Sequence, residues 1–270
     1  MTDIDKNKVG AAFDKAAKVY DGLAEFQQRV CEKLAATLPT LPAECILDGG
    51  CGTGNSAEFL RTQWPDAMLV GCDLSVQMLA QARTRKLIPV CSDLECLPFR
   101  DAGFDLLWSS LALQWCQPQL AYAELQRVLK PGGKLLFSTL TTGSLHELET
   151  AFDGIATHRQ VLPFASVEHL TASLHAAGFT NLQIRTEHYV TQHADFHSLL
   201  ASIRGIGANQ SGRSQNDRSP SSIHQRRGLM GKNAWHAAQA RYEALRDGDG
   251  LLPLSYELLF VCAEKPTVQG

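Results

Sequence analysis

The sequence predicts an α/β protein in which helices cover both faces of a largely parallel β-sheet. Two features of the residues from 44 onward lead to this prediction. Short apolar runs alternate with stretches of helical periodicity, as in chains that return repeatedly to one sheet. The apolar runs are nearly continuous rather than alternating with polar residues, which is typical of strands buried on both faces.

The predicted elements follow in chain order. Residues 8–38 are expected to form two helices, because Val9, Phe13 and Tyr20 begin an apolar stripe at helical spacing. Strands are then expected at residues 45–48, 67–73, 87–91, 104–109, 134–140, 181–190 and 255–264. Helices are expected between them at residues 55–63, 75–85, 118–129 and 166–177.

Local residue chemistry supports several of these boundaries. Ser75 suits an N-cap, Pro118 suits a first helical turn, and Pro-Gly-Gly at 131–133 suits a sharp turn. Residues 194–250 differ from the rest, because they are polar and include the run SGRSQNDRSPSS. We therefore expect N-terminal helices over a site (1–43), a core (44–193 and 251–264), an α-helical and loop insertion (194–250) and a tail (265–270).

Composition excludes several classes of protein. The 270 residues are 44% hydrophobic with a net charge of −3, which argues against general disorder and against a general nucleic-acid binder. No apolar run is long enough to span a bilayer, and the charged N-terminus lacks the apolar core of a signal peptide. We therefore expect a cytoplasmic protein with no membrane partner, and we expect it to be monomeric.

No metal site is expected either. The eight cysteines include no CxxC pair, so neither a zinc ribbon nor a redox pair is indicated. His193 and His197 could share a helix face, but no third ligand follows at motif spacing. Surface histidines are the simpler interpretation.

A glycine-rich loop carries most of the functional information. Residues 46–54, ILDGGCGTG, leave a predicted strand and enter a predicted helix, where glycines allow a ligand to approach the backbone. Asp48 ends that strand and could orient the loop, and Asp73 ends the second strand, where an acid accepts hydrogen bonds from ribose hydroxyls. Asp93 follows the third strand and could meet an adenine amino group. Asn55 replaces the last glycine of GxGxxG, which argues against NAD.

This pattern resembles the class I S-adenosylmethionine-dependent methyltransferases. The resemblance implies a three-layer, Rossmann-like, seven-stranded sheet whose last strand, 255–264, is antiparallel. It implies S-adenosylmethionine as the cofactor, bound by residues of the glycine loop and of the following strand ends. These residues are Asp48, Gly50, Cys51, Gly52, Gly54, Asp73, Leu74, Asp93, Leu94, Ser109 and Leu111, with Leu74 and Leu94 flanking adenine and Ser109 to Leu111 bordering the sulfonium.

Four further stretches resemble a narrower family, the malonyl-[acyl-carrier-protein] O-methyltransferases of the biotin pathway. They are the N-terminal Phe13…Ala16-Ala17…Tyr20 pattern, WSSLALQWC at 108–116, the stretch 139–145 and IRGIGA at 203–208. The resemblance implies methylation of the free carboxyl of a malonyl thioester, with malonyl-acyl carrier protein as the partner.

Carboxyl methylation fits the residues that the cofactor half lacks. A carboxylate with a pKa near 4 is already ionised at pH 7, so no general base is expected. Arg204 is the expected partner of the substrate carboxylate or of a phosphopantetheine phosphate, because a guanidinium binds either oxyanion in a bidentate manner. Tyr20 and Trp115 are expected to wall the pocket, with core packing as the open alternative, and Gln114 could donate a hydrogen bond.

Residues 203–246 are strongly basic. They hold eight Lys or Arg residues against two acidic ones, a net charge of +6. We expect Arg226, Arg227 and Lys232 to dock an acidic carrier protein, although a solvated basic face is the alternative. A nucleic-acid role is disfavoured, because only Trp235 and Tyr242 supply aromatic rings there. Two other functions stay open, namely methylation of a small free acid or quinone-like metabolite, and non-catalytic S-adenosylmethionine binding by a regulator.

Overall fold

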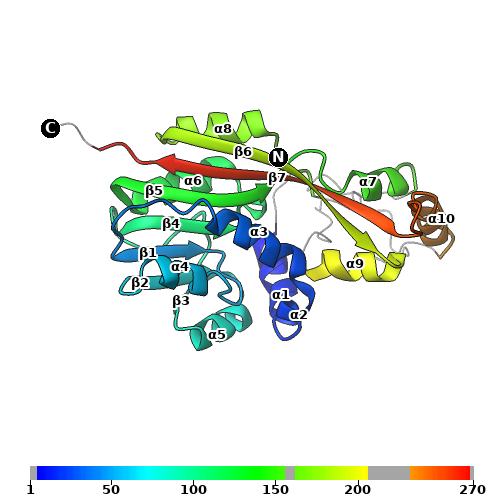
Figure 1. Ribbon diagram of the computed structural model, residues 1–270, viewed down its shortest axis with the longest axis horizontal. Helices are drawn as coiled ribbons and strands as arrows, with labels where there is room; N and C mark the ends of the chain where they lie inside the picture. The colour runs from blue at the N-terminus through cyan, green and yellow to red at the C-terminus, as the bar shows by residue number, and fades with distance from the viewer. Residues whose placement is uncertain (1–4, 156–161, 206–231, 268–270) are drawn as a thin grey trace, which may run out of the picture.

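The computed structural model describes residues 5–155, 162–205 and 232–267, and these residues form a seven-stranded sheet between two helical layers (Figure 1). The strand order is β3-β2-β1-β4-β5-β7-β6. The last strand runs antiparallel to both neighbours, and the other observed pairs are parallel, as predicted. The strands are β1 Cys45–Gly49, β2 Met68–Asp73, β3 Ile88–Cys91, β4 Phe104–Ser110, β5 Leu129–Leu140, β6 Thr180–His193 and β7 Leu252–Glu264.

Two hydrophobic clusters confirm the three layers. Neighbouring strand residues contribute to opposite clusters, for example Ile46 to one and Leu47 to the other, because side chains alternate across a strand. Helices α3, α4 and α5 pack in the first cluster, and α6 and α8 pack in the second. The helices are α1 Lys6–Ala16, α2 Tyr20–Leu23, α3 Glu25–Ala35, α4 Ala57–Gln63, α5 Val76–Thr84, α6 Pro118–Val128, α7 His146–Phe152, α8 Val167–Ala176, α9 Phe196–Gly205 and α10 Lys232–Glu243, with a 3₁₀ turn, η1, at Leu113–Trp115.

Most predicted boundaries agree with the structure within a few residues, and the N-terminal region and the start of β5 are two places where they differ. Ser75 caps α5 by accepting a hydrogen bond from the Met78 N–H at 3.1 Å, and Pro118 begins α6. The N-terminal region contains three helices rather than two, because the short α2 separates α1 from α3. The predicted turn at 131–133 lies inside β5, where Leu129 already pairs with Phe104 and the register then shifts. Gly132, with φ +77°, permits this irregular strand entry.

Strands β6 and β7 form a long hairpin whose end carries the insertion (Figure 1). Their pairing runs from Thr180–Glu264 to His193–Leu252, beyond the end of β5 pairing. Helices α7, α9 and α10 pack around this end, and Phe196 of α9 contacts the Trp235 and Tyr242 rings of α10. In the described parts of the chain, none of the helices is long and apolar enough to cross a membrane.

Candidate cofactor and active site

The predicted cofactor residues meet at one edge of the sheet. Parallel strands β1 to β4 end there, so the loops that follow them converge on a cavity that opens to solvent. The cavity is lined by seven predicted cofactor residues, Gly50, Gly52, Asp73, Leu74, Asp93, Leu94 and Leu111. Helices α1 and α2 close the opposite side with Lys6, Val9, Phe13 and Tyr20.

Each glycine of the loop after β1 has a distinct role. A Cβ on Gly50, which has φ +71°, would lie 2.2 Å from the Ala112 Cβ, so this glycine allows close loop packing. A Cβ on Gly54 would lie 3.1 Å from the Ala82 Cα. Gly52, with φ +52°, meets no protein atom at its Cβ position although it lines the cavity. The loop therefore leaves bare backbone beside open space, as a bound nucleoside requires.

Asp73 stands at the end of β2 with its carboxylate fixed by backbone donors. Its two oxygens accept hydrogen bonds from the N–H groups of Gly52 at 3.0 Å and Ser75 at 2.8 Å. Burial raises the pKa of Asp73 above its ordinary value, while these N–H groups act in the opposite direction. A carboxylate has about four lone-pair sites, so acceptors remain for a ribose hydroxyl.

Four predicted cofactor residues support the loops without lining the cavity: Asp48, Cys51, Gly54 and Ser109. Asp48 is 2% exposed and accepts a hydrogen bond from the Ser56 hydroxyl, which explains why it cannot meet a ligand directly. Burial raises the pKa of Asp48 to about 7, although the Ser56 bond opposes the shift. Ser109 is buried in β4, and Ser110 lines the cavity in its place.

The loop after β4 reaches the cavity through a strained residue. Leu111 lies at φ +52°, a conformation that side chains other than glycine rarely adopt, and its carbonyl accepts a hydrogen bond from Gln114 Nε2 at 2.7 Å. Gln114 Oε1 accepts a second bond from the Thr139 hydroxyl at 3.3 Å. Gln114 also lines an adjacent cavity with Thr139, and its amide contacts Leu111, which lines the first cavity.

Aromatic rings form the side of the cavity opposite the glycine loop. Phe13 lies 6.3 Å from Tyr20 and 6.0 Å from Trp115 between ring centroids, both in edge-to-face arrangements. Tyr20 and Trp115 therefore line the cavity and also pack against Phe13. Trp115 is 5% exposed, and its indole N–H has no hydrogen-bond partner among the residues that the structure describes.

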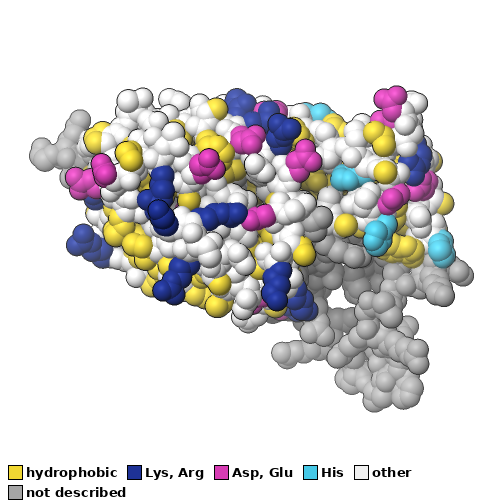
Figure 2. Space-filling model, turned by 60° about the horizontal axis from the view of Figure 1, so that its bottom comes forward, with side chains coloured by type: hydrophobic (Ala, Val, Ile, Leu, Met, Phe, Trp, Pro, Cys, Tyr) yellow, Lys and Arg dark blue, Asp and Glu magenta, His cyan; other side chains and the backbone are white. Residues whose placement is uncertain are grey.

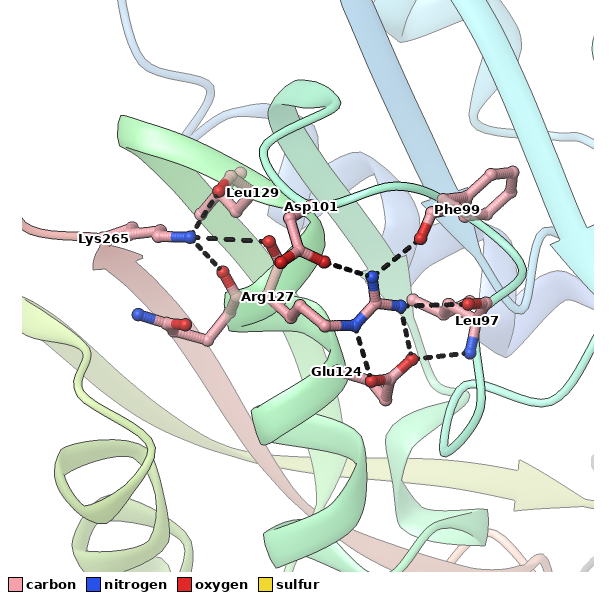
Figure 3. Close-up of polar contacts among 8 residues, drawn as sticks. Leu97, Phe99, Asp101, Glu124, Arg127, Leu129 and Lys265 are labelled. Carbon is pink, nitrogen blue, oxygen red and sulfur yellow. Dashed lines mark hydrogen bonds and ion pairs between the residues drawn. The ribbon is translucent and has the colours of Figure 1, made fainter.

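The loop that carries Asp93 and Leu94 is anchored at its far end by Arg127 (Figure 3). The guanidinium donates to the carbonyl oxygens of Leu97 and Phe99 at 3.0 and 2.7 Å. It also pairs with Glu124, whose carboxylate accepts the Leu97 N–H at 2.8 Å. This network fixes the loop to α6 and hence sets where the predicted adenine residues stand.

Sequence reasoning did not identify Lys6, which also lines the cavity. Its Nζ lies 3.2 Å from Asp93 Oδ1 and 2.7 Å from Glu95 Oε1. The partners lie more than 80 positions away in the chain, so no local spacing could have revealed the contact. Lys6 does lie three residues before Val9, the first residue of the apolar stripe, so helical spacing places the two on one face.

The predicted substrate residues of the insertion lie mostly outside the described side chains. Arg226 and Arg227 are outside the described residues altogether. Arg204 and Lys232 belong to the backbones of α9 and α10, and their side chains are not described. Two other basic residues of the insertion make contacts within the chain. Arg241 donates to the Asp153 carbonyl at 2.7 Å, and Arg246 pairs with Glu243 at 2.6 Å.

Comparison with known proteins agrees with this geometry. Residues 47–137 match a family model described as a methyltransferase domain. The chain is 59% identical over 269 residues to the malonyl-[acyl-carrier protein] O-methyltransferase of Herminiimonas arsenicoxydans, covering 100% of both chains. The chain belongs to the malonyl-[acyl-carrier protein] O-methyltransferase family. A second member, from Dechloromonas aromatica, is 36% identical over 260 residues, with 96% of this chain and 95% of that protein covered.

Membership of the malonyl-[acyl-carrier protein] O-methyltransferase family confirms the predicted methyltransferase and its methyl donor, S-adenosylmethionine. Solved structures confirm the fold. The YcgJ protein of Bacillus subtilis superposes with a TM-score of 0.61 at 15% identity, covering 88% of this chain and 98% of that chain. A putative methyltransferase from Bacillus halodurans gives a TM-score of 0.60 at 19% identity, covering 88% and 99%.

Proposed function

We propose that this chain methylates the free carboxylate of malonyl-acyl carrier protein in biotin (pimeloyl) synthesis. The observation that carries the proposal is the full-length identity of 59% to a malonyl-[acyl-carrier protein] O-methyltransferase. In this reaction the bond from sulfur to methyl breaks as a carboxylate oxygen bonds the methyl carbon, which leaves a methyl ester and S-adenosylhomocysteine. S-adenosylmethionine, when bound, supplies the electrophilic methyl group.

The residues around the cavity fit the adenosyl and methionine parts of that donor. The Gly50 and Gly52 backbone faces the methionine moiety, and Asp73 accepts hydrogen bonds from the ribose hydroxyls. Leu74 and Leu94 flank the adenine, and the Asp93 carboxylate accepts a hydrogen bond from the adenine amino group. Ser110 and Leu111 border the reacting methyl, with Ser110 in the position that the sequence suggested for Ser109.

A carboxylate acceptor needs alignment and exclusion of water rather than a general base. Among the described residues that line the cavity there is no histidine, and each carboxylate there already accepts backbone or ammonium hydrogens. Tyr20 and Trp115 shield the reacting group. Gln114 acts by holding Leu111 in place, because both ends of its amide are engaged within the protein.

The insertion supplies the charge that the acceptor requires. Helix α9, which contains Arg204, packs against α2, which carries Tyr20, so the helix adjoins the wall of the cavity. Arg204 binds the malonyl carboxylate or the phosphopantetheine phosphate. Arg226, Arg227 and Lys232 attract the acidic carrier protein, which approaches from the insertion side of the sheet.

A comparison of acceptors tests the proposal. Methyl transfer from radiolabelled S-adenosylmethionine should proceed with malonyl-acyl carrier protein and should be far slower with free malonate. Faster turnover of free malonate or of a quinone-like acceptor would support the small-molecule alternative. Binding of the donor without transfer to any acceptor would instead indicate a regulator.

A further inference from the structure

Lys6 begins helix α1 at a position that its own helix does not favour. The N-terminus of a helix carries a partial positive charge, which stabilises acidic rather than basic side chains. Asp5 is the N-cap, and its side chain accepts a hydrogen bond from the Lys8 N–H at 3.3 Å. The first turn of α1 contains no acidic residue. The Lys6 ammonium is therefore stabilised from outside α1.

The stabilising groups lie on and near the loop that follows β3. Lys6 Nζ is 2.7 Å from Glu95 Oε1, 3.2 Å from Asp93 Oδ1 and 3.6 Å from Cys116 Sγ. An ammonium has three N–H donors, so these contacts use all of them. Burial acts to lower the pKa of Lys6, but Cys116, Glu95 and Asp93 together raise it above its ordinary value. Lys6 is therefore charged at neutral pH.

The three partners form a group that already holds a cation. The ligand atoms of Asp93, Glu95 and Cys116 lie within 4.8 Å of one another, a spacing that could hold a metal ion. The Lys6 ammonium contacts all three atoms, so the protein provides the positive charge itself. Lys6 belongs to α1, so its ion pairs with Asp93 and Glu95 also attach α1 to the loop after β3, beside the cavity.

The rest of α1 shows what this contact brings into place. Lys6, Val9 and Phe13 recur at i, i+3 and i+7, so they share one face of the helix, and all three line the cavity. Gly10 of α1 lies against the loop after β2, where a Cβ would make an ordinary contact at 3.4 Å with the Leu74 carbonyl oxygen. The Lys6 contact therefore seats one wall of the cofactor cavity.

The N-terminal helices also form hydrogen bonds with the loops that follow β1 and β2. Asp14 Oδ1 accepts a hydrogen bond from the Ser75 hydroxyl at 2.6 Å, after β2. Asp21 Oδ1 accepts one from the Thr53 hydroxyl at 2.6 Å, after β1. Lys6 differs from these two because its partner, Asp93, is itself a predicted ligand of the adenine.

We propose that Lys6 is a positioning residue for the methyl donor. Its ammonium, together with the Glu95 N–H that donates to the same Oδ1 at 3.0 Å, holds the carboxylate of Asp93 in the orientation that accepts a hydrogen bond from the adenine amino group, and it positions α1 over the bound nucleoside. The inference rests on the part of the proposed function that places adenine at Asp93. It does not depend on the methyl acceptor.

Calorimetric binding of S-adenosylhomocysteine to the full chain tests the proposal. Lys6→Met removes the charge and retains an apolar stem, and it should weaken binding about tenfold or more, the loss expected for a charge-assisted hydrogen bond. Lys6→Arg keeps the charge and should retain most of the affinity. Lys15→Met is the matched control, because Lys15 is an exposed lysine of the same helix, and it should change the affinity less than about twofold.

The preference for adenine over hypoxanthine shows whether Lys6 orients Asp93 or only attaches helix α1 to the loop. Wild-type protein should prefer S-adenosylhomocysteine to S-inosylhomocysteine, which carries a carbonyl where adenine carries its amino group. Lys6→Met should bring this preference towards unity, as should Asp93→Asn. The double variant should lose little more than either single variant, because both changes remove the same interaction.

Three results would overturn the proposal. They are unchanged affinity in Lys6→Met, weakened affinity with full base discrimination, and additive losses in the double variant. Circular dichroism of each variant establishes that it is folded. If malonyl-acyl carrier protein proved not to be the acceptor, these binding results would still decide the role of Lys6.

Discussion

The carboxyl of Asp48 shows how a residue can serve the cofactor loop without touching the cofactor. It is 2% exposed at the end of β1, and its hydrogen bond from Ser56 joins the strand to the start of α4. Burial disfavours the charged form and raises the pKa of Asp48 to about 7. The folded protein therefore binds this proton more tightly than the unfolded chain does.

This difference predicts a pH dependence of stability. Because the folded pKa of Asp48 lies above the unfolded value of 3.8, stability falls as pH rises from about 4 to about 7 and stays lower above that. Asp48→Asn should remove the effect, so its free energy of unfolding relative to wild type should rise by about 2–3 kcal/mol between about pH 5 and about pH 8. Urea denaturation at both values measures this. A constant difference would show that the Asp48 pKa is not raised.

The glycine loop offers a matched pair of substitutions. Gly50→Ala should destabilise the protein by about 1–3 kcal/mol, because its Cβ would meet the Ala112 Cβ at 2.2 Å. Gly52→Ala should cost less stability, since its Cβ meets no protein atom, yet it should weaken S-adenosylhomocysteine binding because the methyl group enters the ligand space. Thermal unfolding and calorimetry distinguish the two variants. Equal losses of stability would contradict these separate roles.

Among the elements, sequence patterns identified those that carry apolar runs. The strands of the parallel core were predicted within a few residues, except for the early start of β5. Strands β1, β2 and β4 are buried on both sides, whereas the edge strand β3 is mostly exposed and was identified by its apolar residues alone. The last residues of β6, 191–193, are polar and join the sheet only through pairing with β7. Helix α7 has seven residues and an N-cap, Leu145, with no capping side chain, so neither periodicity nor a cap indicated it.

In the candidate site, some residues were recognisable from the sequence and others depended on the folded structure. Residues 48–54, Asp73 and Asp93 were recognisable because motif spacing fixes where they stand along the chain. Which of them face the ligand depended on strand orientation, and this separated Ser110 from Ser109. Lys6 depended on a contact between distant segments, which sequence spacing does not encode.

The insertion helices are predicted to be part of the folded core. Leu199 in α9 is fully buried, so Leu199→Ala should destabilise the protein by about 2–5 kcal/mol. Leu245, just beyond α10, is 39% exposed, and Leu245→Ala should cost less than about 1 kcal/mol. Urea unfolding compares the two variants. Similar small effects for both would mean that α9 contributes little to the core.

At the scale of the whole molecule, charge is distributed unevenly along the chain. Basic and acidic side chains both occur over the face in Figure 2, whereas residues 203–246 hold eight basic residues against two acidic ones. Arg241 and Arg246 make contacts within the fold, whereas the proposed docking surface consists of Arg226, Arg227 and Lys232. A near-neutral total thus leaves room for a local field that attracts an acidic partner.

Charge reversal tests this distribution. Arg226→Glu with Arg227→Glu should raise the KM for malonyl-acyl carrier protein about tenfold or more at low salt, and the effect should shrink as salt screens it. Arg83→Glu with Arg100→Glu changes the same charge at two exposed positions outside the insertion and serves as the control. Equal effects of the two double variants would assign the change to net charge rather than to a docking surface.

Intact-protein mass spectrometry of malonyl-acyl carrier protein tests the central claim most directly. After incubation with this chain and S-adenosylmethionine, the carrier protein should gain the mass of one methyl group, and mild alkaline hydrolysis should remove it as expected for an ester. Carrier protein without the malonyl group should remain unchanged. A malonyl carrier protein of unaltered mass, or a methyl group that resists ester hydrolysis, would contradict carboxyl methylation.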